Sequence, residues 1–505
     1  MSPPLLRLAR WARELTVSAV PADVLHLTRL RFLAAAGGIH AAAATNAGAE
    51  ILTRIVGGTG APAGRADLGA NAEIGASLLA RFAMDDWQLG GRLGLASLPF
   101  AGERAAGHTL DELLVAVIAA EEIAGRIGLA TLLSARASHS ALWPAAAAGA
   151  AVVALLDGRN AEGIAEAVAG AVSRARRQGG ALPLSALDAD PARLGAEVVA
   201  AVRAGLIHGG AHSLLDADHP FWDEVCTRPL PGALTGEGEA WLSRSVVVPP
   251  EPGLPWTQVP VQAVGEILRR HVKAAERRLR VDQVERIEIH VPWLAWALDQ
   301  AAASLPGPGG LLGSIPRLCA VRIAHHLLTP AQLDPAAIDA HAADLTRLAG
   351  LVHVVHDWEP SFATVRGVSE ALGPVLSGFG RADYRALRGR LKAQGEWPRW
   401  SPAEARTLIA APVLPILRAL RTPAGDLTRC ALHPFVWPLP VRVRLYTTRG
   451  GWWPERRAQP EGTVAGGDLA YIARARFGDE TRADTFLACP GTTPAPEALA
   501  GLSAR

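Results

Sequence analysis

Apolar residues recur at helical spacing through the first half of the chain. The clearest example begins at Thr109 and Glu112, which have the spacing of a capping box in which two side chains satisfy free backbone amides. Apolar positions then follow from 113 to 127, and Glu122 and Arg126 lie four residues apart, where they can pair on one face. The pattern predicts a long buried helix.

Further helices are predicted in the same half of the chain, over residues 141–156, about 161–172 and about 192–204. The first of these is almost entirely alanine and apolar residues, as expected of a helix packed on all sides. The segment 173–180 is rich in arginine and ends in two glycines, so we expect it to interrupt the helical pattern.

The pattern changes near residue 245. The proline-rich segment 248–253 indicates a crossing between domains, and a helix is expected from about 260 to 279. Residues 287–291 then alternate between apolar and polar, which is typical of a half-buried strand, and 351–355 and 441–445 are two further candidate strands.

These elements predict a mainly α fold with a large all-helical domain and a smaller α+β domain. We expect the helical domain to span residues 1–255 and the α+β domain residues 256–455. The C-terminal segment, 456–505, returns to helix and loop and is expected to rejoin the helical domain.

Composition and charge narrow the functional classes. The chain has 505 residues, half of them hydrophobic, and a net charge of +2, so no long-range field attracts nucleic acid or an anionic membrane. The longest apolar run, 141–156, is short for a membrane span and contains Pro144. Four scattered cysteines suit neither a disulfide framework nor a zinc site, which favours the cytoplasm.

Lysine is scarce, and this limits the chemistry available to the chain. Of the 50 lysines and arginines, two are lysines, Lys273 and Lys392, which leaves 48 arginines. A Schiff base or a lysine general base therefore has only two positions available. Arginine is too basic to accept protons near neutral pH, so it can only bind and polarise anionic groups.

Five segments, in chain order, carry a resemblance to a known family: residues 83–87 (AMDDW), 108–130, 138–140 (SHS), 200–209 and 314–321. Together they resemble the MmgE/PrpD family, which includes 2-methylcitrate dehydratase and cis-aconitate decarboxylase. The resemblance implies a helical domain with an α+β lid, usually as a homodimer. It also implies an active site between the two parts that acts on small polycarboxylates without a metal or cofactor.

The chain departs from the family pattern at several active-site positions. A histidine expected after the second aspartate falls on Leu95, and lysines expected near Leu184 and Val248 are absent. A histidine at the start of the lid-crossing helix aligns with Gln258, and a tyrosine aligns with Arg317. The family chemistry therefore does not transfer intact.

The candidate catalytic residues are Asp85, Asp86 and His139, which match the family pattern. Two adjacent carboxylates repel each other, which raises the pKa of one of them, and the apolar wall of Trp87 would raise that pKa further. Alternatively, the two aspartates are an N-cap and a surface acid without a catalytic role. Imidazole is the usual proton carrier at neutral pH, so His139 is the candidate base, the alternative being a core or capping histidine.

The candidate substrate-binding residues are Arg176, Arg177, Arg317, Gln258 and His208, together with Trp87. Arginine presents a planar fork that suits carboxylate, sulfate or phosphate, although the arginines near 176 are equally typical of a solvated charge run. Gln258 can donate a hydrogen bond but cannot move a proton.

The sequence HGGAH, from His208 to His212, carries two histidines four residues apart. Its glycine pair argues against the helix that a metal site of this spacing needs, so we predict a loop lining the cleft and no metal. Metal-dependent hydrolysis by the histidines at 208–219 is the remaining alternative.

These observations lead to two main hypotheses. The first is a cofactor-independent lyase or isomerase that abstracts a proton from a small anionic metabolite in specialised metabolism, with elimination or intramolecular cyclisation. The second is a catalytically inactive relative that acts as a binding or structural subunit. The expected assembly is a homodimer, as the resemblance implies, or a hetero-oligomer, in which the inactive relative would be one subunit.

Overall fold

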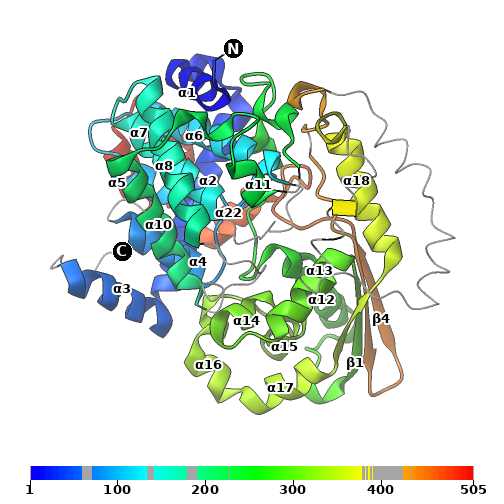
Figure 1. Ribbon diagram of the computed structural model, residues 1–505. Coiled ribbons are helices and arrows are strands. Elements are labelled where there is room, and N and C mark those ends of the chain that lie inside the picture. Colours follow the sequence, from blue (N-terminus) through cyan, green and yellow to red (C-terminus); the bar gives the residue numbers. More distant parts are fainter. Residues whose placement is uncertain are drawn as a thin grey trace.

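The computed structural model describes residues 2–59, 71–132, 142–178, 190–226, 228–377, 425–433 and 435–503, and between 377 and 425 only residues 382, 385, 386 and 389. In Figure 1 helices of the first half of the chain gather in one part, and a small sheet with its own helices forms the other. The described chain is therefore mainly helical with a small mixed sheet, in agreement with the predicted fold class.

The helical part is built from helices of the N-terminal half. They are α1 (Pro4–Glu14), α2 (Ala22–Ala43), α3 (Asn46–Thr59), α4 (Ala72–Arg81), α5 (Gly94–Glu103), α6 (Leu110–Ala130), α7 (Leu142–Leu156), α8 (Ala161–Gln178), α10 (Pro191–His208) and α11 (Phe221–Val225). Helix α7 packs against α5, α6, α8 and α10, and almost all of its side chains are buried. Alanine and glycine make this possible because small side chains allow helices to approach closely.

The predicted capping box is present at the start of α6. The Thr109 hydroxyl accepts from the Glu112 backbone amide at 3.3 Å, and the Glu112 carboxylate accepts from the Thr109 amide at 2.7 Å. The predicted pair of Glu122 and Arg126 also forms, and both side chains are buried. The long helix is therefore confirmed.

One predicted helix end is wrong. Helix α8 continues to Gln178, past the end expected at about residue 172. Residues 173–178 (SRARRQ) contain no glycine and consist mostly of good helix formers, so nothing in them stops the helix.

The second part contains the sheet. Strands β1 (Val284–Val291), β2 (Val352–His356), β3 (Val441–Thr447) and β4 (Trp452–Arg457) lie in the order β2-β1-β3-β4. β1 pairs with β2 in parallel and with β3 in antiparallel register, and β3 pairs with β4 in antiparallel register. The first three were predicted. β4 was missed because Pro454 and its charged residues lie on an edge strand with no buried face.

The helices of this part are α12 (Pro255–Ala275), α13 (Trp293–Ala303), α14 (Gly307–Gly313), α15 (Ile315–His325), α16 (Pro335–Ala340), α17 (Ala342–Gly350) and α18 (Trp358–Leu376). Helix α12 begins five residues before the predicted start, with Pro255 in its first turn, where the missing amide hydrogen costs nothing. It ends at Ala275, where Glu276 takes a left-handed conformation with φ of 53°.

The described C-terminal segment lies against the helical part. It contains α22 (Leu469–Phe477), α23 (Glu480–Ala488) and α24 (Ala495–Ala500). Helix α22 packs on α2 so closely that a side chain at Gly37 would overlap the backbone of Arg476. The amides of Leu110 and Asp111 donate to the carbonyls of Thr493 and Gly491, both at 2.8 Å. This segment thus returns to the helices of the first half.

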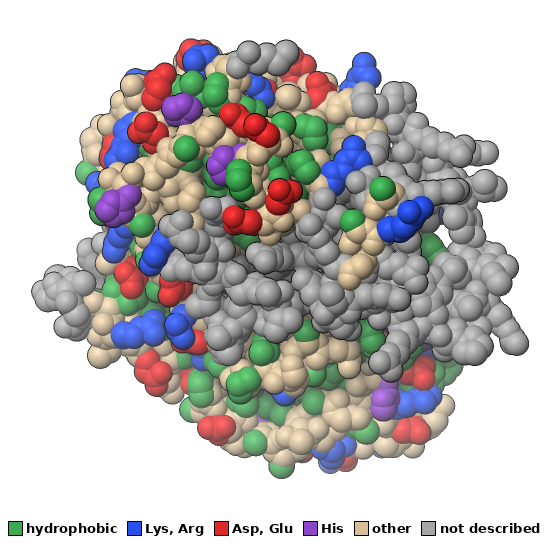
Figure 2. All heavy atoms as spheres, in the orientation of Figure 1, with side chains coloured by type: hydrophobic (Ala, Val, Ile, Leu, Met, Phe, Trp, Pro, Cys, Tyr) green, Lys and Arg blue, Asp and Glu red, His purple; other side chains and the backbone are tan. Residues whose placement is uncertain are grey.

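Short 3-10 turns connect these elements. They are η1 (Val17–Ala19), η2 (His212–Leu215), η3 (Pro231–Leu234), η4 (Leu242–Ser245), η5 (Val281–Gln283), η6 (Pro330–Leu333) and η7 (Leu427–Arg429). Among the described residues, no helix combines the length and the apolar character needed to cross a bilayer. On the face shown in Figure 2, acidic and basic side chains are interspersed over the described surface.

Candidate functional site

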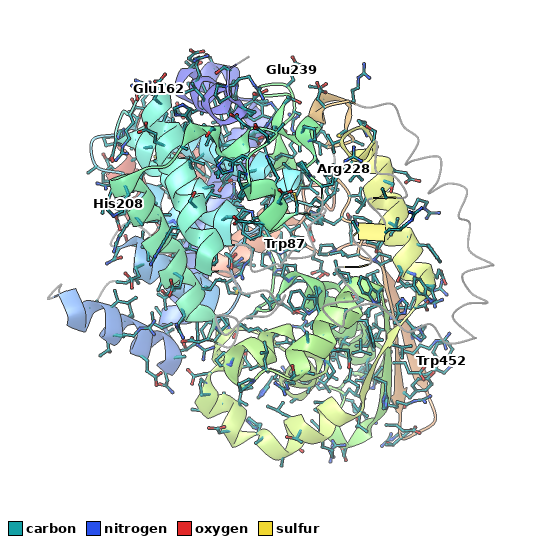
Figure 3. The ribbon with its side chains drawn as sticks, in the orientation of Figure 1. Trp87, Glu162, His208, Arg228, Glu239 and Trp452 are labelled. Atoms are coloured by element: carbon teal, nitrogen blue, oxygen red, sulfur yellow. The ribbon has the colours of Figure 1, made fainter. Side chains whose placement is uncertain are left out.

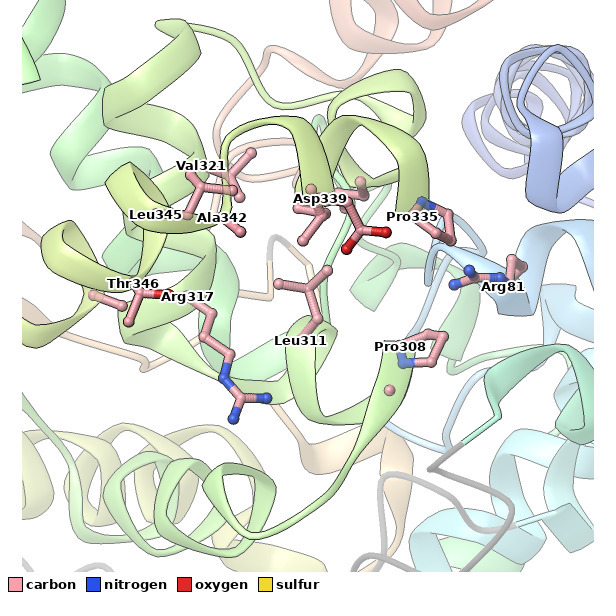
Figure 4. Close-up of a pocket in the computed structure, with 14 residues that line it drawn as sticks. Arg81, Pro308, Leu311, Arg317, Val321, Pro335, Asp339, Ala342, Leu345 and Thr346 are labelled. Atoms are coloured by element: carbon pink, nitrogen blue, oxygen red, sulfur yellow. The ribbon is translucent and has the colours of Figure 1, made fainter.

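A cavity of about 500 Å³ lies where the end of α4 meets helices α14 to α17 (Figure 4). The cavity lies between the two parts of the molecule, because α4 belongs to the helical part and the other helices belong to the part with the sheet. Four of the described lining side chains are charged or polar: Arg81, Arg317, Asp339 and Thr346. The remaining wall is formed by Gly307, Pro308, Leu311, Val321, Leu333, Pro335, Ile338, Ala342, Leu345 and Ala349.

Arg81 is the most unusual residue of this cavity. It is the last residue of α4, is only 7% exposed, and places its guanidinium 5.0 Å from the ring centroid of Phe82. It forms no hydrogen bond or ion pair with any residue that the structure describes. Burial lowers the pKa of Arg81, although more distant carboxylates oppose that effect. A buried guanidinium without a counterion is costly, so this end of the cavity is suited to an anion.

Arg317 enters the cavity from α15, on another side from Arg81, with Leu311 between them in the view of Figure 4. It is half-buried, and its Nη2 atom is 3.5 Å from the carbonyl oxygen of Ala303. The other guanidinium nitrogens have no described partner, so Arg317 retains donors for a ligand.

The start of α15 is positioned by two polar side chains. Ser314 caps the helix by accepting from the Arg317 amide at 3.4 Å, and Asp299 accepts from the Ile315 amide at 2.7 Å. Burial raises the pKa of Asp299 to about 6, while the hydrogen bond from Ile315 and the charge of Arg317 oppose the rise. These contacts fix the first turn of α15 and, with it, the origin of the Arg317 side chain.

Asp334 joins the two sides of the cavity. Its carboxylate caps its own helix, α16, by accepting from the Ala336 amide at 3.2 Å. It also accepts from the Asn46 amide at the start of α3, at 2.5 Å. One carboxylate therefore satisfies the amino-terminal amides of helices from both parts of the molecule.

A carboxylate is also among the described lining groups of the cavity. Asp339 lies on α16, is exposed, and forms no ion pair with any described residue. Thr346 on α17 adds a hydroxyl to the wall. The lining side chains that the structure describes thus carry two positive charges and one negative charge.

The predicted catalytic aspartates lie elsewhere. Asp85 and Asp86 are 3% and 5% exposed, and neither lines the cavity. Arg92 Nε donates to Asp85 Oδ2 at 2.7 Å, and Arg31 Nε donates to Asp86 Oδ2 at 2.6 Å. Each carboxylate therefore faces its own guanidinium, which removes the basis for the expected mutual repulsion. The alternative of an N-cap and a surface acid also fails, because both side chains are buried.

Arg31 binds a second carboxylate, that of Glu121, and all three side chains are enclosed in the helical part. Ser97 and Gln88 also donate to the Glu121 carboxylate. Burial raises the pKa of Glu121, and the charge of Arg31 opposes the rise. The void beside Asp85 and Asp86 has no room for a water molecule, so this charged cluster is closed to substrate.

Two predicted substrate-binding residues are engaged in the protein itself. The Gln258 amide nitrogen donates to the carbonyls of Glu251 at 3.0 Å and Gly253 at 2.9 Å, so both of its hydrogens are already used. Trp87 is buried against Trp437, with ring centroids 4.5 Å apart, between the two parts of the molecule (Figure 3). Neither side chain lines the cavity.

His208 is exposed at the end of α10, on the outside of the helical part in Figure 3. At His208 the structure has the end of α10 where a loop was expected, and His208 is not among the residues that line the described cavity. Within the described part of the chain, no group of three or more histidine, cysteine or acidic side chains is arranged to hold a metal ion. All four cysteines are free.

Several other candidates fall wholly or partly outside the part of the chain that the structure describes. His139 lies outside the described residues, as does Leu184. Arg176 and Arg177 belong to the last turn of α8, but their side chains are outside the described set. Leu95 is a core residue of α5 and does not line the cavity.

Of the predicted residues whose side chains the structure describes, Arg317 lines the cavity, and the sequence analysis missed Arg81 and Asp339. The sequence contains one signal for Arg81, which is the single charged residue in the stretch 74–84. Asp339 has no comparable signal. No protein-family model matches the chain, and no curated protein is significantly similar to it in sequence.

Proposed function

We propose that this chain is a divergent relative of the MmgE/PrpD enzymes that binds a small anionic metabolite in the cavity between α4 and α14–α17. The observation that carries the proposal is the buried Arg81 guanidinium, which faces a cavity of about 500 Å³ and has no counterion among the described residues. Arg317 supports it from the other side of the cavity. A cavity of this size suits a small organic ligand.

The proposed chemistry is that of a lyase or isomerase. A base removes a proton from the carbon next to the anionic group, and the electron pair of that bond forms a double bond or attacks intramolecularly while a leaving group departs. The arginines hold the substrate and stabilise the negative charge that develops on its carboxylate oxygens, or on the oxygens of a sulfate or phosphate that departs as the leaving group. His139 is the proposed base. The reaction as proposed uses no cofactor, and it takes place in the cytoplasm in a homodimer.

A second candidate function is binding without catalysis, in a structural subunit of a hetero-oligomer. It is favoured by the fact that Asp85, Asp86 and Gln258, three aligned polar residues, use their polar atoms within the protein. The two candidates share the anion-binding cavity and differ only in turnover.

The test is a pair of measurements on the purified full chain with a panel of small hydroxy acids. Binding is followed by calorimetry, and turnover by NMR spectra of the substrate and its product, which detect both elimination and cyclisation. We expect Arg81→Gln to weaken binding at least about tenfold, since it removes a charged hydrogen bond in a buried site. His139→Ala should abolish turnover and leave binding in place.

Arg269→Gln is the matched control, because Arg269 is an exposed arginine that pairs with Glu266 on the surface of α12. It should change neither binding nor turnover. Binding without turnover for every acid would favour the second candidate. Binding that Arg81→Gln leaves unchanged would overturn both.

A further inference from the structure

The cavity wall also indicates which kind of anion it accepts. Building on the proposed function, we infer that the ligand is an amphipathic monocarboxylate, with its carboxylate on Arg81 and an aliphatic or aromatic body along the apolar wall. This differs from a tricarboxylate, whose charge is spread over the whole molecule. The inference rests on the lining residues and on their charges.

The apolar wall is the first argument. Apart from its charged and polar residues, the described wall consists largely of apolar side chains such as Leu311, Val321, Leu333, Ile338 and Leu345. These side chains offer no hydrogen bonds, so a carboxylate placed against them would lose its hydration without compensation. A hydrocarbon body placed there gains from leaving water.

The second argument is that Arg81 and Arg317 differ in burial and in hydrogen-bonding partners. Arg81 is almost fully buried and has no hydrogen-bonding partner in the described chain, whereas Arg317 is half-buried and approaches the carbonyl of Ala303. An unsatisfied guanidinium in a drier setting binds a carboxylate more strongly. Arg81 is therefore the site of the ligand's carboxylate, and Arg317 lies along its body or at its far end.

Asp339 is the third argument. Its carboxylate lines the same cavity and has no ion-paired partner within the described part of the chain. Among the described lining side chains the net charge is therefore +1, which matches one carboxylate. A second or third negative charge on the ligand would meet repulsion from Asp339. Asp339 thus selects ligands by charge.

The test compares three acids by calorimetry on the full chain at low ionic strength: octanoate, acetate and tricarballylate. Octanoate has the carboxylate and a long apolar body, acetate has the carboxylate alone, and tricarballylate has three carboxylates on a short chain. We expect octanoate to bind at least about tenfold more tightly than either of the others, because only octanoate uses both the guanidinium and the wall.

Two variants separate the contributions. Leu311→Ser removes part of the apolar wall. It should therefore weaken the binding of octanoate and leave the affinity for acetate unchanged. Asp339→Asn removes the repelling charge. It should therefore raise the affinity for tricarballylate about fivefold and leave the affinity for octanoate nearly unchanged. Circular dichroism and the melting temperature establish that each variant is folded.

The outcomes distinguish this inference from the proposed function. If tricarballylate binds more tightly than octanoate, and Arg81→Gln abolishes that binding, the monocarboxylate inference is overturned and the anion-binding function stands. Equal binding of octanoate and acetate, with no effect of Leu311→Ser, also overturns the inference alone. If none of the acids binds, both fail.

Discussion

At the scale of single residues, the helical part stabilises buried charge by direct pairing. Arg31 is fully enclosed and contacts the carboxylates of Asp86 and Glu121, while Arg92 pairs with Asp85. Charges taken out of water are tolerated only when oppositely charged groups and hydrogen bonds replace the lost hydration. Arg81 breaks this rule within the described chain, and for that reason it is the residue that points to a ligand.

Replacing Arg31 should be strongly destabilising. Arg31→Met leaves two buried carboxylates without their cation, and we expect it to lower the free energy of unfolding by about 3–5 kcal/mol. Arg244→Met is the control, because Arg244 binds the more exposed Asp23 and should cost no more than about 1 kcal/mol. Denaturant unfolding measures both changes. Similar small losses for the two variants would show that the Arg31 cluster is not a stabilising unit.

The Glu251 carboxylate predicts a pH dependence of stability. It pairs with Arg322 of α15 and is 12% exposed, and burial raises its pKa from 4.5 to about 7 against the opposing charge of Arg322. Between these values the folded protein keeps a proton that the unfolded chain has released. The contribution of Glu251 to the free energy of unfolding is therefore complete below about pH 4.5 and is lost as the pH rises to about 7. This loss amounts to about 3 kcal/mol at most.

Glu251→Gln removes this titration, so the variant should lose less stability than the native chain between pH 4.5 and 7.5. Glu266→Gln is the control, because the hydrogen bond from Arg269 lowers the pKa of Glu266, which places its effect below pH 4.5. Denaturant midpoints across this range measure the slopes. If the stability of the native chain and that of Glu251→Gln fall in parallel with pH, the pH dependence does not come from Glu251.

At the scale of elements, close backbone packing positions the segment that carries Asp85 and Asp86. The turn at Gly90 and Gly91 lies directly on α6, where a Cβ at Gly128 would overlap the carbonyl oxygen of Gly90. The turn is closed by two hydrogen bonds of 2.9 Å between Gln88 and Gly91. Glycine at this crossing lets the loop approach the helix backbone and holds the aspartates inside the helical part.

Gly128→Ala should therefore destabilise the protein by about 1–3 kcal/mol, because neither backbone can move away without disturbing the charged cluster. Gly350→Ala is the matched control. Gly350 is also the glycine of a helix, at the end of α17, but no atom lies within 4 Å of an added Cβ. It should leave stability unchanged or raise it by less than about 1 kcal/mol. Thermal unfolding tests both, and equal behaviour would argue against the close crossing.

At the scale of the whole molecule, the cavity exists because two parts of the chain meet. Arg81 comes from the helical part, and Arg317 and Asp339 come from the part with the sheet (Figure 4). Asp334 fastens this junction by capping α16 and by accepting from the first amides of α3. Ligand affinity should therefore depend on contacts that never touch the ligand.

Asp334→Ala should lower the free energy of unfolding by about 1–3 kcal/mol, since it removes caps from two helices. It should also weaken binding of the anionic ligand, because the two walls of the cavity lose a shared anchor. Asp426→Ala removes a cap from η7, away from the cavity, and is the control. It should lower stability alone. A loss of binding in both variants would indicate general destabilisation instead of a specific junction.

The sequence by itself determined the features that depend on near neighbours. The capping box at Thr109, the ion pair of Glu122 with Arg126 and three of the four described strands follow from spacings of a few residues. The ends of helices follow less directly from the sequence, as the extension of α8 to Gln178 shows. A helix ends only where the free-energy cost of adding another residue exceeds the gain from packing that residue.

Tertiary structure decided the rest. Asp85 and Asp86 look alike in the sequence, but their roles are set by Arg92 and Arg31, and the carbonyls that occupy Gln258 are presented by a loop whose path is tertiary. The cavity combines Arg81 with Arg317, which are far apart in the chain. Charge, burial and free hydrogen-bonding capacity are properties of surroundings, and distant segments create those surroundings only when the chain has folded.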